Sequence, residues 1–159
     1  MNEQGYLWLL NENANMKSIP SPSDFEVFGK AILCCANGDG RISPAERAWV
    51  IGYLDAYGAP KSTLEKLQTY EAKEDIAQIL NSSPTKKVAA TGLLYDAVRA
   101  CYADGELQNG ERQGLEKMGR AMGIDAATVR DLIELYHEEQ SLKAKRLRRI
   151  FPEGNPFEG

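Results

Sequence analysis

The chain contains two acidic turns that match each other in sequence and stand 65 residues apart. The first spans residues 39–47 (DGRISPAER) and the second spans residues 104–112 (DGELQNGER). In each turn an Asp-Gly pair is followed by an aliphatic residue, and a Glu-Arg pair ends the turn. Gly58 and Gly123 keep the same offset, so the match continues through the following segment. Two copies at so long a period are typical of a duplicated half-domain rather than of a solenoid.

The distribution of charge limits the kinds of partner. The formal net charge of the 159 residues is −4, but residues 141–159 carry five basic and two acidic side chains, and the rest carries 14 basic and 21 acidic ones. An acidic body argues against nucleic acid as the main partner, because phosphate binding needs clustered Lys and Arg. The basic run 143–149 suits the end of a helix through the helix dipole. Alternatively, it docks on an acidic protein or an anionic membrane surface.

Cysteine usage and hydropathy predict the compartment. The three cysteines (Cys34, Cys35 and Cys101) lie in apolar stretches, and an odd number with two adjacent does not form a disulfide framework. We expect them to be small buried side chains. No stretch approaches the roughly 18 consecutive apolar residues of a membrane span. The sequence therefore predicts a cytoplasmic protein that is not an integral membrane protein.

Apolar periodicity predicts an all-α fold. Residues 1–22 read as an N-terminal extension with residues 6–10 on the domain surface, residues 23–149 as one helical domain, and residues 150–159 as a tail. Within the domain, apolar residues recur at helical spacing in about seven segments, and no convincing strand pattern occurs. We expect a single compact bundle built from two related helix–turn–helix halves. Its oligomeric state cannot be predicted from these patterns.

Local signals predict where individual helices begin. Ser23 or Asp24 is expected to cap the first helix of the domain. Ser43 and Glu46 fit a capping box around the following proline, whereas Gln108 stands where the second turn would need such a cap. A long helix is expected from about residue 83, and a last helix from about 125 to 149 with Leu142 on its inward face.

The acids of the two turns occupy unusual positions. On helical spacing, Asp39, Glu46, Asp104 and Glu111 each stand at the loop end of a face that otherwise packs inward. A carboxylate that is buried without a partner costs several kcal/mol. Two carboxylates brought together also repel each other unless a positive group lies between or beside them.

Three interpretations of these acids remain open. They could cap helices, with Arg47 neutralising them; they could hold a divalent cation; or they could act as an acid–base pair. An EF-hand calcium loop is excluded, because its first ligand position would be Cys35 in one copy and Ala100 in the other. A cation site shared by the two halves is not excluded.

The paired Asp-Gly-x-aliphatic-x-x-x-Glu motif, within a helical domain of this length, resembles the tellurite-resistance TerB family over residues 23–140. The second half also has the family's acid eight residues before the Asp-Gly pair, at Asp96, whereas the first half departs with Ala31. The resemblance implies a compact helical domain whose acids chelate metal. It also implies an association with tellurite and other chemical stress, and partners that can be membrane-linked.

Together these patterns predict a non-enzymatic stress-response module that acts through protein partners. The expected metal ligands are Asp39, Glu46, Asp104 and Glu111, with Asp96 as a weaker candidate. Oxygen ligands favour calcium, magnesium or manganese. The main alternative is a metal-free interaction scaffold whose acids only cap helices. An enzyme using a metal-bound water is a third hypothesis, and it predicts a deep pocket beside Asp104.

Overall fold

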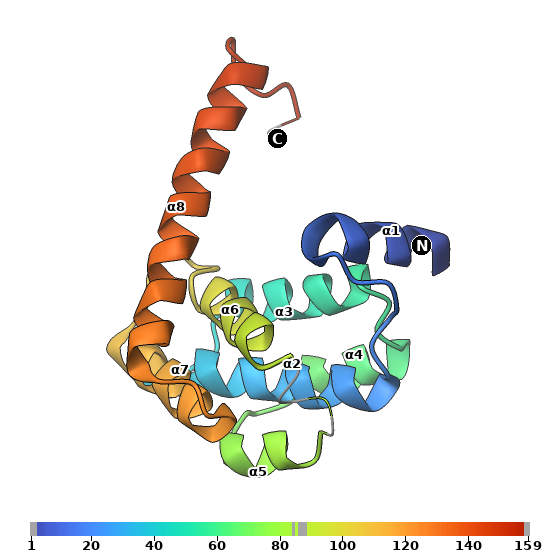
Figure 1. The fold of residues 1–159 in the computed structure, drawn as a ribbon, viewed down its shortest axis with the longest axis vertical. Coiled ribbons are helices and arrows are strands. Elements are labelled where there is room, and N and C mark those ends of the chain that lie inside the picture. The colour runs from blue at the N-terminus through green and yellow to red at the C-terminus, as the bar shows by residue number, and fades with distance from the viewer. Residues whose placement is uncertain (1–2, 84, 86–88, 158–159) are drawn as a thin grey trace.

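The computed structural model describes residues 3–83, 85 and 89–157, and over these residues the chain is all-α (Figure 1). Eight α-helices and one short 3-10 helix are present among the described residues, and no strand is. The elements are α1 (Glu3–Ala14), α2 (Pro22–Ala36), η1 (Asn37–Asp39), α3 (Pro44–Ala56), α4 (Lys61–Gln68), α5 (Ile76–Asn81), α6 (Ala90–Cys101), α7 (Asn109–Met122) and α8 (Ala126–Ile150). The all-α prediction is confirmed, and α1 is the helix that it did not include.

Helix α2 forms the centre of the fold. It packs against α3, α4, α5, α6 and α7, so its C-terminal half is surrounded on all sides. Residues 31–36 are therefore all buried, which explains the uninterrupted apolar run in the sequence. Cys34 and Cys35 lie in this run and Cys101 ends α6; all three are free and buried. The expectation that they are small core side chains is confirmed.

Helix α1 is part of the packed structure. Leu10 is buried and belongs to the main hydrophobic core, whereas Trp8 on the same helix is 65% exposed. The expectation that residues 6–10 lie on the domain surface is therefore wrong for Leu10. The sequence pattern missed this helix because its apolar residues are consecutive rather than spaced three and four apart.

The start of α2 differs from its prediction. Ser21 is the N-cap and Pro22 occupies the first turn, so the helix begins before Ser23 and Asp24. Asp24 is instead buried, and its carboxylate accepts hydrogen bonds from Ser21 Oγ (2.7 Å), Ser83 Oγ (2.9 Å) and Thr85 Oγ1 (2.7 Å). This side chain therefore ties the start of α2 to the segment that precedes α6.

The boundaries of the later helices are mostly as expected. Helix α6 begins at Ala90 rather than near residue 83; Pro84 and Val88, which were placed in it, lie outside the described residues. Helix α7 ends at Met122, with Gly123 in the left-handed conformation (φ 78°). Asp125 caps α8, where its Oδ1 accepts a hydrogen bond from the Thr128 N–H.

Helix α8 packs on the body only through its first half. It contacts α6 and α7, and Tyr136 stacks on Tyr102 with ring centroids 4.5 Å apart. Beyond that point the helix projects away from the body (Figure 1). Leu142 is 66% exposed in this projecting half, so its expected inward position is wrong.

Candidate functional site

The two acidic turns lie directly against each other. Helix η1, which carries Asp39, packs on the start of α7, which carries Glu111. The closest approach is between two glycines: a Cβ on Gly38 would stand 2.5 Å from the Glu111 nitrogen, and a Cβ on Gly110 would stand 2.7 Å from the Asp39 nitrogen. Only residues without a side chain permit this contact. The two acidic turns, one from each half of the chain, are therefore in direct contact.

Both glutamates turn back on the start of their own helix. Glu46 Oε2 accepts the Ser43 N–H at 2.6 Å, and the Glu46 N–H donates to Ser43 Oγ at 3.2 Å, which completes the predicted capping box. Glu111 Oε2 accepts the Gln108 N–H at the same 2.6 Å. Glu111 thus keeps the capping contact although Gln108 replaces the serine. One oxygen of each carboxyl group is used for this purpose.

The two glutamate carboxyl groups meet in the interior. Each residue is only 2% exposed, and the Glu46 side chain lies close enough to Glu111 to raise its pKa. The pKa of Glu111 is raised to about 8, first by burial and then by the neighbouring Glu46 side chain and the negative charges of Glu46 and Asp104, while the Gln108 N–H opposes the rise. At neutral pH the pair therefore holds a proton, which relieves the repulsion between the two carboxylates. A bound cation would relieve the same repulsion.

The two aspartates behave differently from the glutamates. Asp39 and Asp104 are exposed, and each uses its Oδ1 to accept a backbone N–H from its own turn, that of Arg41 (2.9 Å) and that of Glu106 (3.3 Å). The expectation that all four carboxylates lean inward is correct for the glutamates and wrong for the aspartates. Asp39 ends the short 3-10 helix η1 and Asp104 lies in a turn, so α-helical spacing does not determine the direction of either side chain.

Arg47 does not neutralise the acids as one interpretation expected. Its guanidinium donates to the Leu67 carbonyl oxygen at 2.7 Å and to the Tyr70 carbonyl oxygen at 3.0 Å. It therefore ties α3 to the end of α4 and to the segment that follows it.

Asp96 lies in a different environment. Its carboxylate accepts a hydrogen bond from Tyr53 Oη at 2.8 Å and forms a longer ion pair with Arg99 at 3.5 Å. Burial raises the pKa of Asp96 to about 6, and the contacts with Tyr53 and Arg99 partly oppose this rise. Asp96 lines a cavity between α1, α3 and α6, whereas Glu46 and Glu111 meet at the starts of α3 and α7.

As placed, the acids do not surround a complete ion site. Within residues 3–83, 85 and 89–157, no three His, Cys, Asp or Glu side chains are grouped so that they could hold a metal ion. The converging ligands are the two glutamates, with Asp104 close enough to influence the pKa of Glu111. The cavity of about 460 Å³ that lies beside Asp96 does not include Asp104 in its lining, where the enzyme hypothesis expected a deep pocket.

Sequence reasoning missed the residues that bring the turns together. Gly38 and Gly110 each stand immediately before one of the predicted acids, which is the only signal in the sequence. Tyr53, which holds Asp96, lay unmarked among the apolar positions of its helix. In both cases the role of the residue depends on a contact between segments that are distant in the sequence, and local sequence patterns do not reveal such contacts.

Comparisons with known proteins identify the fold and the family. No family model matches the chain, and no curated protein matches it. Among solved structures, the chain is similar to a tellurite resistance protein from Nostoc punctiforme, with a TM-score of 0.88 and 33% sequence identity. The match covers 99% of this chain and 100% of that one. Identity at this level over the full length shows common membership, and the chain therefore belongs to the TerB-like tellurite-resistance protein family.

Proposed function

We propose that the chain is a tellurite-resistance-related module that binds a divalent cation between its two acidic turns and acts through protein partners. The observation that carries this proposal is the buried pair formed by Glu46 and Glu111. Two carboxyl groups in contact at 2% exposure need a shared positive charge, and a cation supplies it more completely than one proton does.

The ligand set follows from the contacts of the four acids. Glu46 and Glu111 would each give the oxygen that does not cap a helix. Asp39 and Asp104 would join by rotating inward, at the cost of one backbone hydrogen bond each, and both are exposed and free to turn. Such a rotation would complete the oxygen set that the unrotated aspartates do not provide. Oxygen-only ligands favour calcium, magnesium or manganese.

Calorimetric titration of Ca²⁺, Mg²⁺ and Mn²⁺ tests the cation site. The parent is expected to bind at least one of the three ions, and the double variant Asp39→Ala, Asp104→Ala is expected to bind it more weakly. The matched control is Asp55→Ala, Asp131→Ala, which removes two exposed acids outside the turns and so the same net charge. Equal heats from the parent and the turn variant would refute the cation site.

A metal-free scaffold is the second candidate, and one observation favours it. Both glutamates already accept an N–H at the start of their own helix, at 2.6 Å, so capping alone gives each of them a role. Thermal melts separate the two functions. A cation at 100 times its Kd adds about 2.7 kcal/mol to the stability of the folded state. A scaffold would melt at the same temperature with and without the ion.

The proposed protein partners carry an acidic surface, and the projecting half of α8 would receive them. Residues 137–146 of this helix are exposed. The basic side chains of this half of the helix are Lys143, Lys145, Arg146, Arg148 and Arg149. Binding of a poly-glutamate peptide, lost in Lys143→Gln, Lys145→Gln, Arg146→Gln, would support this partner chemistry. Stronger binding to phosphatidylserine vesicles than to the peptide would support a membrane-linked partner instead.

The proposed role is not catalytic and its proposed location is the cytoplasm. Three free, buried thiols suit a reducing compartment. None of the helices described in residues 3–157 is long and apolar enough to cross a membrane. Growth of tellurite-sensitive bacteria on tellurite tests the family role directly: the parent chain is expected to improve growth, and Glu46→Gln, Glu111→Gln is expected to lose that effect. If neither the parent nor the variant improved growth, the tellurite role would be refuted, and the result of the metal titration would be unaffected.

A further inference from the structure

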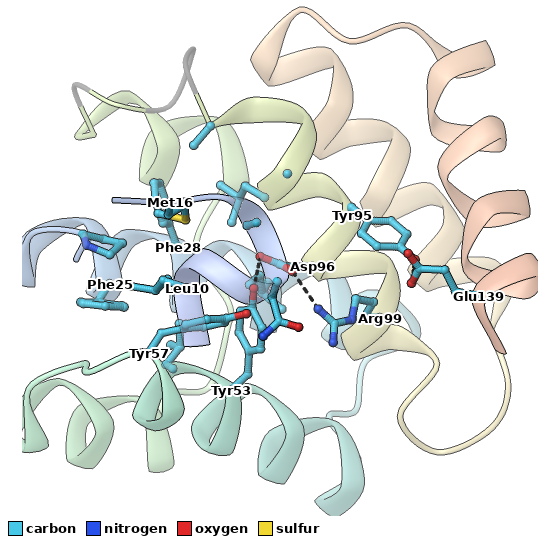
Figure 2. A pocket seen from close by; sticks show the side chains of 18 residues that line it. Leu10, Met16, Phe25, Phe28, Tyr53, Tyr57, Tyr95, Asp96, Arg99 and Glu139 are labelled. Carbon is cyan, nitrogen blue, oxygen red and sulfur yellow. Dashed lines mark hydrogen bonds and ion pairs between the residues drawn. The ribbon is translucent and has the colours of Figure 1, made fainter. Parts of the chain in front are cut away.

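A cavity of about 460 Å³ opens beside α1, away from the acidic turns (Figure 2). This volume falls within the range of small-molecule sites, roughly 300–1,000 Å³. Its walls come from α1, α2, α3 and α6, with Glu139 of α8 at one edge. Most of the lining is apolar or aromatic, including Leu10, Met16, Phe25, Phe28, Ile32 and Leu93. The cavity thus has a wall suited to a hydrocarbon or aromatic body.

One carboxylate faces this apolar wall. Figure 2 shows Asp96 between the group formed by Leu10, Phe25 and Phe28 and the side chain of Arg99. Asp96 Oδ2 accepts the Tyr53 hydroxyl at 2.8 Å, but Oδ1 has only the 3.5 Å contact with Arg99, at the limit of a hydrogen bond. The carboxylate side chain is 22% exposed, so little water compensates its charge. This oxygen therefore has the capacity for a shorter bond to a positive group.

Aromatic rings stand beside the same carboxylate. Tyr53 and Tyr57 both line the cavity and pack edge to face, with ring centroids 4.5 Å apart and planes at 84°. Electron-rich ring faces next to a carboxylate attract an ammonium group, and this is the arrangement that recognises organic cations. Arg99 already occupies part of this surface, because its guanidinium lies over the rings of Trp49 and Tyr53, 5.2 and 5.3 Å from their centroids. A ligand ammonium group would therefore rely on Asp96 and on the ring of Tyr57.

We propose that this cavity binds an organic amine, with its ammonium group at Asp96 beside Tyr53 and Tyr57 and its apolar body along Phe25, Phe28 and Leu10. This site is independent of the cation site proposed above. An anionic ligand is disfavoured because the charged side chains among the described residues of the lining are two acids, Asp96 and Glu139, and one base, Arg99. A neutral hydroxyl ligand can donate a hydrogen bond to this carboxylate oxygen, but that bond is weaker than one from an ammonium group.

Calorimetry with three probes of equal chain length tests the charge preference. n-Octylamine is expected to bind at least about tenfold more tightly than octan-1-ol, because its ammonium group makes a charge-assisted hydrogen bond. Octanoate is expected to bind most weakly of the three. Asp96→Asn should abolish the preference for the amine while it keeps the binding of the alcohol. The matched control Asp55→Asn removes an exposed acid outside the cavity and should change neither.

A second variant blocks the cavity without weakening the helix. Gly92 lines the cavity within α6, and no atom lies within 4 Å of where its Cβ would stand, so Gly92→Leu places a side chain over the opening. The matched control is Gly52→Leu, at an equally open glycine of α3 outside the cavity. Gly92→Leu is expected to lose n-octylamine binding and to keep the parent's cation titration.

Two results would overturn the amine site. One is equal affinity of the parent for n-octylamine and octan-1-ol. The other is n-octylamine binding that survives in Gly92→Leu as strongly as in Gly52→Leu, because the amine would then bind elsewhere on the acidic surface. Neither result depends on whether the acidic turns bind a cation, so the two proposals fail separately.

Discussion

The backbone of Gly38 lies against that of Gly110 so closely that neither residue has room for a side chain. This contact joins the first acidic turn to the second. Replacement of Gly110 by Ala is expected to destabilise the fold by at least about 2 kcal/mol, because the Cβ would meet the backbone of Gly38 and Asp39 rather than a flexible side chain. Urea denaturation monitored by circular dichroism measures the change.

Gly52→Ala is the control for the glycine prediction. Gly52 lies in α3 with open space around its Cβ position, so alanine there should raise stability by about 0.5–1 kcal/mol through helix propensity alone. If Gly110→Ala were as stable as the parent, the two turns would not be held together by this contact.

The raised pKa of Glu111 predicts how stability changes with pH. The folded state holds the Glu111 proton up to a pKa of about 8, whereas the unfolded chain releases it near the ordinary glutamate pKa of 4.5. Folding is therefore favoured at low pH, and this contribution is lost as the pH rises from about 4.5 to 8. In metal-free buffer we expect a loss on the order of a few kcal/mol over this range.

Glu111→Gln should flatten that pH dependence, because glutamine keeps the hydrogen bond and cannot ionise. Added Mn²⁺ should oppose it in the parent, since the ion must displace the proton and binds more tightly as the pH rises toward 8. A parent that is equally stable at pH 5 and pH 8 without metal would contradict the buried pair.

Asp24 is expected to be a strong determinant of stability. Burial would raise its pKa, but the hydrogen bonds from Ser21, Thr85 and Ser83 outweigh burial and hold the pKa below its ordinary value. Asp24→Ala leaves buried hydroxyl groups without their acceptor and should cost about 2–3 kcal/mol. Guanidinium denaturation measures this cost; Asp55→Ala, at an exposed position, should change stability by less than about 0.5 kcal/mol.

Helix α1 should contribute to the stability of the whole domain. Leu10→Ala removes a side chain that is 2% exposed in the main core and should cost about 2–5 kcal/mol. We expect the lower end of that range, because Leu10 also borders the cavity and part of its surroundings is already empty. Trp8→Ala, on the exposed face of the same helix, is the control. Equal melting temperatures for the two variants would mean that α1 is not docked in solution.

The sequence predicted those features that depend on local chemistry. Ser43 and Glu46 formed their capping box, and Gly123 ended α7, because each signal lies within one turn of its effect. The burial of Glu46 and Glu111 also followed from helical spacing. The duplication of the two halves stays a prediction, although their turns use the same backbone and capping contacts.

The predictions that were wrong concern features that do not follow from local sequence patterns. Leu142 was placed inward because its spacing is helical, but it is exposed, because this part of α8 projects away from the body (Figure 1). Asp24 was assigned to a helix cap, and only the approach of Ser83 and Thr85 gives it a buried role. The direction of the Asp39 and Asp104 side chains depends on loop backbone, which helical periodicity does not describe.

The projecting half of α8 separates two parts of the molecule in space. A 25-residue helix is about 37 Å long, and its N-terminal half is clamped by α6 and α7 beside the second turn. A partner bound at the C-terminal end of α8 would therefore lie far from Glu46 and Glu111. Loss of the outer end should thus abolish the proposed partner binding and leave the proposed cation binding intact, so that mutations can separate the two.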